Sequence, residues 1–117
     1  MIYIIRHGQT ELNNAQVLQG RSDQPLNEKG IIQAKEASVM LRRHGIHFDY
    51  VFASPLIRAV QTAEIVASEK KPVLDQRLIE MDYGPYEGAD LKNPSPELQF
   101  FFSDFIHNPA PEGMEQL

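Results

Sequence analysis

The sequence contains no cysteine, and this absence excludes several kinds of chemistry at once. Disulfide bonds, thiolate zinc sites and a cysteine nucleophile are all ruled out. Basic residues are also scarce, with 11 Lys and Arg against 16 Asp and Glu, which gives a formal net charge of −5. Nucleic-acid-binding domains usually carry a basic face, so we expect no nucleic-acid partner.

Long apolar runs are missing as well. No segment is long enough to span a bilayer, so we expect no membrane partner. The first apolar run starts at Met1 without a basic leader and is too short for a signal peptide, which leaves the cytoplasm as the expected location. No repeat, low-complexity tract or linker divides the sequence. We therefore expect residues 1–117 to form one domain with a small core.

One apolar stretch organises the rest of the sequence. Residues 2–5 (Ile-Tyr-Ile-Ile) are β-branched or aromatic without alternation, which predicts a strand buried on both faces of a parallel sheet. Arg6, His7 and Gly8 follow directly, where α/β sheets bind their ligands. An arginine can bind phosphate or carboxylate through two parallel hydrogen bonds, and a neutral imidazole can act as nucleophile or base. The alternative is a strand end whose polar residues merely meet solvent.

The helices are marked by their caps. Asn27 is a predicted N-cap for a helix over Glu28–Arg43, and His44-Gly45 is a predicted C-cap. Ser95-Pro96 opens a last helix, whose apolar residues we expect in the core or over a pocket: Leu98, Phe101, Phe102 and Phe105. Residues 9–26 are polar and irregular, which predicts a long loop. Such loops are usually functional, although a solvated surface loop is the alternative.

Two further strands end in polar residues. Residues 50–53 predict a strand, and Ser54-Pro55 after it resembles a serine N-cap with proline in the first helical turn. Arg58 lies in that turn, where a helix N-terminus favours an anion, although a surface ion pair is the alternative. Pro72–Leu74 predicts a third strand. The acidic loop after it is either a site or a solvated segment.

Strands that alternate with helices predict an α/β fold with three layers, in which a mostly parallel sheet carries helices on both faces. The carboxyl ends of the three predicted strands would bring all three candidate segments to one edge. Their coincidence is more informative than any one of them.

Three groups of residues carry a resemblance. The first is Arg6-His7-Gly8-Gln9-Thr10-Glu11 with Asn13, Leu18-Gln19-Gly20, Asp23-Gln24-Pro25-Leu26, Gly30 and Gln33-Ala34. The second is Ser54-Pro55-Leu56-Ile57-Arg58-Ala59 with Gln61-Thr62-Ala63, and the third is Glu80-Met81-Asp82-Tyr83-Gly84 with Glu87-Gly88. In this order they resemble the histidine phosphatase superfamily, also called the phosphoglycerate mutase-like family. A lone Arg-His-Gly would be weak, but three ordered blocks at strand ends are specific and cover nearly the whole chain.

The resemblance implies a role for each matching residue. His7 would attack phosphorus and become a phosphohistidine, and Glu80 would be the acid/base carboxylate. The substrate-binding residues that it implies are Arg6, Asn13, Gln19, Gly20 and Arg58. Because the two arginines, which would also act in catalysis, neutralise charge on the transferring phosphoryl group, we expect neither a metal nor a cofactor.

The sequence departs from the family pattern near its end. Family members carry a second catalytic histidine on a later strand, usually followed by glycine, and no such block is present here. His107 follows a predicted helix and not a strand, so we do not assign it this role. Residues 112–115 (Glu-Gly-Met-Glu) resemble the loop that leads into the missing part. We therefore expect the phosphoglycerate mutase-like fold to be incomplete.

The function that the resemblance implies is a phosphatase that hydrolyses a small phosphate ester through a phosphohistidine. The short segment between Glu80 and Ser95 is more similar to the phosphatase branches, but a phosphoglycerate mutase is an alternative. A non-catalytic phosphate-binding or interaction module is another, and the missing histidine favours it. An unpaired sheet edge near the first strand would promote association, so we expect the chain either to form a homo-oligomer or to be only marginally stable.

Overall fold

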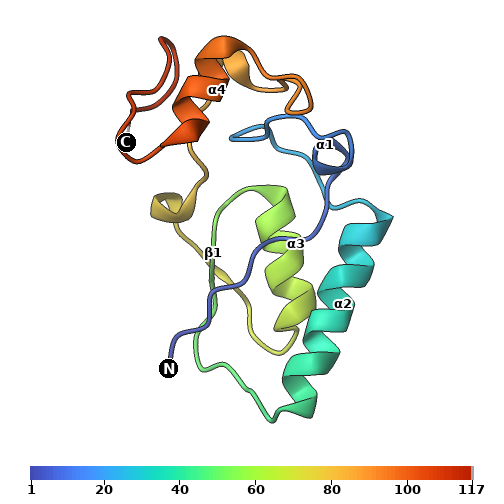
Figure 1. The fold of residues 1–117 in the computed structure, drawn as a ribbon. Coiled ribbons are helices and arrows are strands. Elements are labelled where there is room, and N and C mark those ends of the chain that lie inside the picture. Colours follow the sequence, from blue (N-terminus) through green and yellow to red (C-terminus); the bar gives the residue numbers. More distant parts are fainter. Residues whose placement is uncertain (117) are drawn as a thin grey trace. The chain divides into compact units, whose positions relative to one another are not determined.

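The structure, a computed structural model, describes residues 1–116 (Figure 1). The chain divides into two compact units, which are described separately below. Unit 1 comprises Met1–Glu11 and Asp23–Ile79, and unit 2 comprises Leu12–Ser22 and Glu80–Leu117. Within the described part of the chain, no helix has the length and apolar character needed to cross a membrane.

The longest helix of unit 1 is α2, Glu28–Arg43, and it has the predicted bounds. Its N-cap is confirmed, because the Asn27 side chain accepts a hydrogen bond from the Gly30 N–H at 2.8 Å. The C-cap is confirmed too: His44 ends the helix, and Gly45 after it has φ of +65°, which glycine adopts without strain. Small residues occupy much of the buried face, which consists of Gly30, Ala34, Ser38 and Leu41.

A parallel pair of strands gives unit 1 its α/β character. Strand β1 (Phe52–Ala53) pairs with β2 (Val73–Leu74), and Phe52 lies opposite Val73. Helix α3 (Ile57–Val66) connects them, and it contacts both β1 and α2 (Figure 1). The core of this unit is a cluster of Ala34, Leu41 and Val66. The predicted α/β class is confirmed, although both strands are shorter than their sequence patterns suggest.

The predicted start of α3 is wrong. Ser54-Pro55 does not cap this helix, which begins at Ile57 with Leu56 as N-cap residue and no side-chain cap. The Ser54 hydroxyl accepts a hydrogen bond from the Leu56 N–H at 3.3 Å instead, in a local turn. The Ile57 N–H donates to Asp23 Oδ1 at 2.7 Å. A carboxylate from a distant part of the sequence therefore satisfies the first turn.

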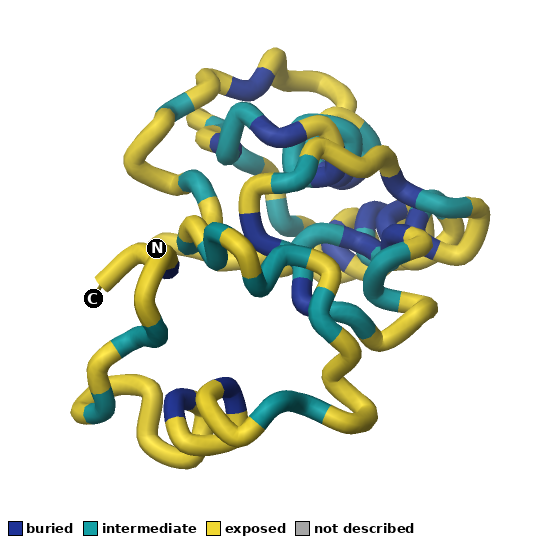
Figure 2. The backbone as a smooth tube through the Cα atoms, turned by 90° about the horizontal axis from the view of Figure 1, so that it is seen from above, coloured by how far each residue is buried: buried dark blue, intermediate teal, exposed yellow. Residues whose placement is uncertain are grey.

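The predicted first strand is not formed in the described structure. Residues 1–9 belong to neither a helix nor a strand, and Ile2 and Ile4 are 89% and 95% exposed. Figure 2 shows that buried residues occur in short groups separated by exposed backbone. The apolar pattern therefore describes a segment that can be buried, but a strand also needs hydrogen-bonded neighbours. Tyr3 does pack edge-to-face against Phe48, with ring centroids 5.7 Å apart.

Short helices and turns make up the region after β2 and most of unit 2. The single-turn helix α1 (Glu11–Asn14) interrupts the predicted loop. Two 3-10 helices follow β2, namely η1 (Gln76–Leu78) in unit 1 and η2 (Gly84–Tyr86) in unit 2. Helix α4 (Pro96–Ser103) starts as predicted, since the Ser95 hydroxyl accepts a hydrogen bond from the Leu98 N–H.

The core of unit 2 is built on one face of α4. Leu98 and Phe101 are 1% exposed and pack with Leu18 and Met114. Phe102 and Phe105 are 41% and 52% exposed, so the predicted stripe is only half buried. Leu98 and Phe101 lie three residues apart on one helix face, whereas Phe105 lies beyond the end of α4.

We predict that Asn27→Ala lowers the free energy of unfolding by about 1 kcal/mol, because the Gly30 N–H loses its cap. Asn27→Ser is the matched control, since serine keeps a capping oxygen while losing the hydrogen bond from Asn27 Nδ2 to Gln9 Oε1. Urea unfolding of both variants measures the difference. Equal losses in the two variants would show that the Gln9 contact matters and the cap does not.

Candidate active site

His7 has a defined imidazole orientation. Its Nδ1 lies 2.7 Å from the Gly8 carbonyl oxygen. Because a carbonyl can only accept, Nδ1 must carry a hydrogen, and in a neutral ring the lone pair is then on Nε2. The side chain is half-buried. The geometry therefore prepares Nε2 to act as a base or a nucleophile.

The backbone after His7 packs directly on helix α2. A Cβ atom on Gly8 would lie 2.5 Å from the Gly30 carbonyl oxygen, so Gly8 has no room for a side chain. The absence of a side chain at Gly8 thus allows the two backbones to approach each other closely. Further contacts hold the next residue: the Gln9 N–H donates to Gln33 Oε1 at 2.9 Å, and the Asn27 N–H donates to the Gln9 carbonyl at 3.0 Å.

Of the two candidate phosphate-binding arginines, only one is buried. Arg58 lies in the first turn of α3 and is 2% exposed, which excludes the alternative of a surface arginine. A guanidinium group can bind a phosphoryl group through two parallel hydrogen bonds. Arg6 directly precedes His7 and is exposed.

Thr62 links these residues, although no role for it was predicted from the sequence. Its hydroxyl accepts a hydrogen bond from the Gly8 N–H at 3.1 Å and donates to the Arg58 carbonyl at 2.8 Å. Thr62 is 6% exposed. Its only sequence signal was its place in the second block, beside Gln61 and Ala63.

Unit 2 holds the other predicted site residues, among which Gly20 marks a close contact between two loops. A Cβ atom on Gly20 would lie 2.5 Å from both the Met81 carbonyl oxygen and the Tyr83 ring. The loop that carries Gln19 therefore touches the loop that carries Glu80. Gln19 is half-buried in its loop, and Asn13 is half-buried in α1.

Several contacts hold the Glu80 loop in place. The Met81 N–H donates to Glu80 Oε1 at 2.8 Å, and Arg21 Nε donates to the Glu80 carbonyl at 3.1 Å. Glu115 accepts from the Asp82 N–H at 2.7 Å and from Arg21 Nη2 at 3.3 Å. The Glu80 side chain is exposed, so its carboxylate is accessible.

Glu87 organises the Gln19 loop through one carboxylate oxygen. Its Oε1 accepts from the Gly20 N–H at 2.8 Å and from the Ser22 N–H at 3.1 Å. The Ser22 hydroxyl donates to the same oxygen. Neither Glu87 nor Ser22 was assigned a role from the sequence, although Glu87-Gly88 belongs to the third block. Within unit 2 this oxygen acts as a positioning group.

The phenol of Tyr83 lies in an acidic part of unit 2. Burial raises the pKa of Tyr83, and the negative charges of Glu80 and Glu87 raise the pKa further. The Tyr83 phenol therefore interacts electrostatically with both carboxylates.

The other histidines lie elsewhere. His44 is the C-cap of α2, as predicted. His47 is exposed, 3.9 Å from Glu69, which confirms it as a surface residue. His107 pairs with Asp104 in the turn after α4, at 2.9 Å, and 78% of its side chain is exposed. This pair is local, because the two residues are only three positions apart in the sequence.

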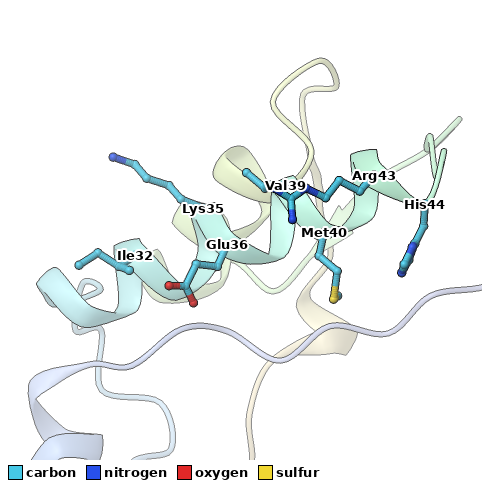
Figure 3. A pocket seen from close by; sticks show the side chains of 7 residues that line it. All are labelled: Ile32, Lys35, Glu36, Val39, Met40, Arg43 and His44. Carbon is cyan, nitrogen blue, oxygen red and sulfur yellow. The ribbon is translucent and has the colours of Figure 1, made fainter.

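A hollow of about 520 Å³ lies along the exposed side of α2 (Figure 3). Its lining comes from a single helix and contains none of the predicted site residues: Ile32, Lys35, Glu36, Val39, Met40, Arg43 and His44. The view shows Met40 and His44 projecting from this helix. We assign no role to this hollow.

A comparison against known families agrees with the order of the three blocks. The model of the histidine phosphatase superfamily (branch 1) matches residues 2–117. The chain belongs to this family. The three-block resemblance is therefore confirmed over nearly the whole chain.

Relatives within the histidine phosphatase superfamily carry both mutase and phosphatase names. The chain is 39% identical to a probable phosphoglycerate mutase GpmB from Yersinia pestis, over 99% of this chain and 57% of that protein. A phosphoglycerate mutase from Thermus thermophilus superposes with a TM-score of 0.79 at 30% identity, over 95% of this chain and 60% of that one. A putative alpha-ribazole-5'-P phosphatase from Escherichia coli gives 0.77 at 30% identity, over 96% and 57%. The chain thus spans about three fifths of each relative.

We predict that Glu87→Ala speeds hydrogen exchange at the Gly20 and Ser22 amides and lowers stability by about 1–3 kcal/mol, because partly buried donors lose their acceptor. Glu87→Gln is the control, since its amide oxygen can still accept both bonds. Exchange is followed by NMR, and stability by urea unfolding. Unchanged amide protection in Glu87→Ala would rule out Glu87 as the organiser of this loop.

Proposed function

We propose that the chain carries the nucleophilic part of a phosphatase that hydrolyses a small phosphate ester through a phosphohistidine. The observation that carries the proposal is the hydrogen bond between His7 Nδ1 and the Gly8 carbonyl, which fixes the ring and assigns the Nδ1 hydrogen, so that Nε2 is the nitrogen that could attack phosphorus. Family membership supports the same reaction class. The substrate is a phosphate monoester, and the neighbouring Arg6 supports the binding of its anionic oxygens.

In the first step, Nε2 of His7 attacks phosphorus. A P–N bond forms, the P–O bond to the alcohol breaks, and the leaving oxygen takes a proton from protonated Glu80. Arg6 and Arg58 hold the non-bridging oxygens and neutralise their charge, which is the main requirement of phosphoryl transfer. The proposal therefore requires no metal ion and no cofactor, and turnover in the presence of a chelator accompanies the test below.

In the second step, water attacks the phosphohistidine. The Glu80 carboxylate takes a proton from this water, the P–N bond breaks, and its electron pair returns to Nε2. Inorganic phosphate leaves, and both side chains regain their starting protonation states. By family resemblance, Asn13, Gln19 and Gly20 are proposed as further phosphate-binding residues.

A phosphoglycerate mutase is the second candidate, because a relative bears that name. The two activities differ in the acceptor of the phosphoryl group, which is water for a phosphatase and a hydroxyl of the organic substrate for a mutase. Incubation with a phosphoglycerate, followed by phosphorus NMR, separates free phosphate from the isomerised ester. A non-catalytic phosphate-binding module would give neither product.

We predict that His7→Ala abolishes both ester turnover and the acid-labile phosphoenzyme, because no other group replaces Nε2. The control is His47→Ala, which removes an exposed histidine. Labelling with a radioactive phosphate ester, with and without a chelator, measures the intermediate directly. Normal labelling of His7→Ala would remove His7 from the mechanism, and labelling that needs an added divalent metal would remove the metal-free mechanism.

We propose further that the 117-residue chain self-associates through its first residues, because Ile2 and Ile4 expose almost their whole side chains. Sedimentation velocity should show an oligomer or aggregate that Ile4→Lys weakens. Ile32→Lys introduces the same charge on the exposed side of α2 and is the control. Association that is lost in the control instead would place the contact on α2, and a stable monomer would exclude self-association.

The same test extends to activity. A chain that continues beyond residue 117 to the length of the relatives should hydrolyse esters about 10²- to 10³-fold faster, the effect of supplying one positioned catalytic donor. It should also remain monomeric if the additional residues cover the exposed first stretch. Equal activity of the two chains would show that residues 1–117 already hold every group that the reaction needs.

A further inference from the structure

The residue after His7 is held through both of its peptide groups. The His7–Gly8 peptide donates its N–H to Thr62 Oγ1 at 3.1 Å, in a buried position. The Gly8–Gln9 peptide donates its N–H to Gln33 Oε1 at 2.9 Å, while its carbonyl oxygen lies 2.7 Å from His7 Nδ1. The group that orients the His7 ring is thus fixed by side chains from two helices.

The backbone at residue 8 needs these hydrogen bonds because the residue is a glycine. Gly8 cannot be replaced by a residue with restricted φ and ψ, because a Cβ would meet the Gly30 carbonyl. A glycine backbone has more conformational freedom than any other residue, so rotation at Gly8 would move its carbonyl away from Nδ1. The hydrogen bond from the Gly8 N–H to Thr62 opposes this rotation on one side of the Cα atom.

Thr62 also connects Gly8 to the turn that carries Arg58. Its hydroxyl has one hydrogen, which it donates to the Arg58 carbonyl at 2.8 Å, so its oxygen lone pairs remain for the Gly8 N–H. The donor direction of each bond is therefore determined. Both Thr62 and Arg58 are at least 94% buried, which keeps water from replacing either bond.

We propose that Thr62 is a positioning residue that orients the His7 imidazole through Gly8 and keeps Nε2 unprotonated for attack. This role rests on the proposed function for its kinetic consequence only. The orientation of His7 and its tautomer can be measured without any turnover. Thr62 touches neither the phosphate nor the reacting atoms.

The test replaces Thr62 with valine, which removes the hydroxyl at nearly constant volume, and with serine, which keeps it. Thr62→Val should lower kcat about 10- to 100-fold with KM within about twofold, the range seen when groups that orient metal-binding histidines are removed. Thr62→Ser should recover most of the rate. Imidazole carbon and nitrogen shifts of His7 should show the Nδ1–H tautomer in the parent chain and a tautomer mixture in Thr62→Val.

Ser38→Ala is the matched control. It removes another hydroxyl that is 5% exposed, on α2, and this hydroxyl has no hydrogen-bond partner among the described residues. Its kcat and its His7 shifts should equal those of the parent chain. A fall in kcat in Ser38→Ala as large as in Thr62→Val would mean that loss of any buried hydroxyl has this effect, and would overturn the proposal.

Other outcomes are equally decisive. A folded Thr62→Val with parent kcat and a parent His7 tautomer would overturn the proposal. If Thr62→Val does not fold, Thr62→Ala removes the same hydroxyl with a smaller side chain, and unchanged His7 shifts in that variant would overturn the proposal. If the parent chain shows no turnover, the proposed function fails alone, because a tautomer change in Thr62→Val still supports the positioning role.

Discussion

Direct backbone packing between the segment after His7 and helix α2 is the constraint on which unit 1 depends. Gly8 and Gly30 each face the other segment's backbone, so neither position tolerates a side chain. Close packing of this kind brings the first residues of the chain onto the helix without intervening side-chain atoms. Because no side chain orders the backbone at Gly8, hydrogen bonds to Thr62 and Gln33 order it instead. The His7 ring is consequently oriented by main-chain atoms whose own positions are set by two helices.

In unit 2, a carboxylate orders the backbone beside a closely packed glycine. Gly20 again allows two loops to touch, and again a hydrogen-bond acceptor fixes the backbone beside the glycine. Here the acceptor is the Glu87 carboxylate, whose negative charge strengthens each bond that it accepts. The same charge disfavours a nearby anion. Its engagement with three donors from Gly20 and Ser22 keeps that charge directed into the protein.

The sequence predicted those features that local residues determine. Helix α2 with both of its caps and the N-cap of α4 follow from side chains within four residues of the helix ends. The start of α3 was wrong because Asp23, 34 residues away along the chain, supplies the acceptor for its first turn. The prediction of the first strand was wrong because an apolar pattern shows only that a segment can be buried. Strand formation also requires a neighbouring strand, which the local sequence cannot reveal.

For the candidate site too, the sequence predicted local features but not long-range contacts. Motifs identified His7, Arg58, Gly20 and Glu80 by residue type and order, which is how a family resemblance works. Thr62 contacts Gly8 across 54 residues and Glu87 contacts Gly20 across 67, so neither role could be deduced from spacing. Burial of Arg58 was likewise open in the sequence, because a first-turn arginine can point to solvent or into the protein.

The parallel pairing of β1 with β2 has a consequence for the order of folding. Parallel neighbours cannot be joined by a tight turn, so Phe52 meets Val73 only after the intervening chain has doubled back through α3. Closing this loop costs conformational entropy before the strands make any stabilising contact. Helices α2 and α3, in contrast, form hydrogen bonds between residues that are close in the sequence. Helix formation should therefore precede strand pairing in unit 1. During that interval the apolar residues of both strands remain open to other chains, and the nascent protein is most vulnerable to aggregation then.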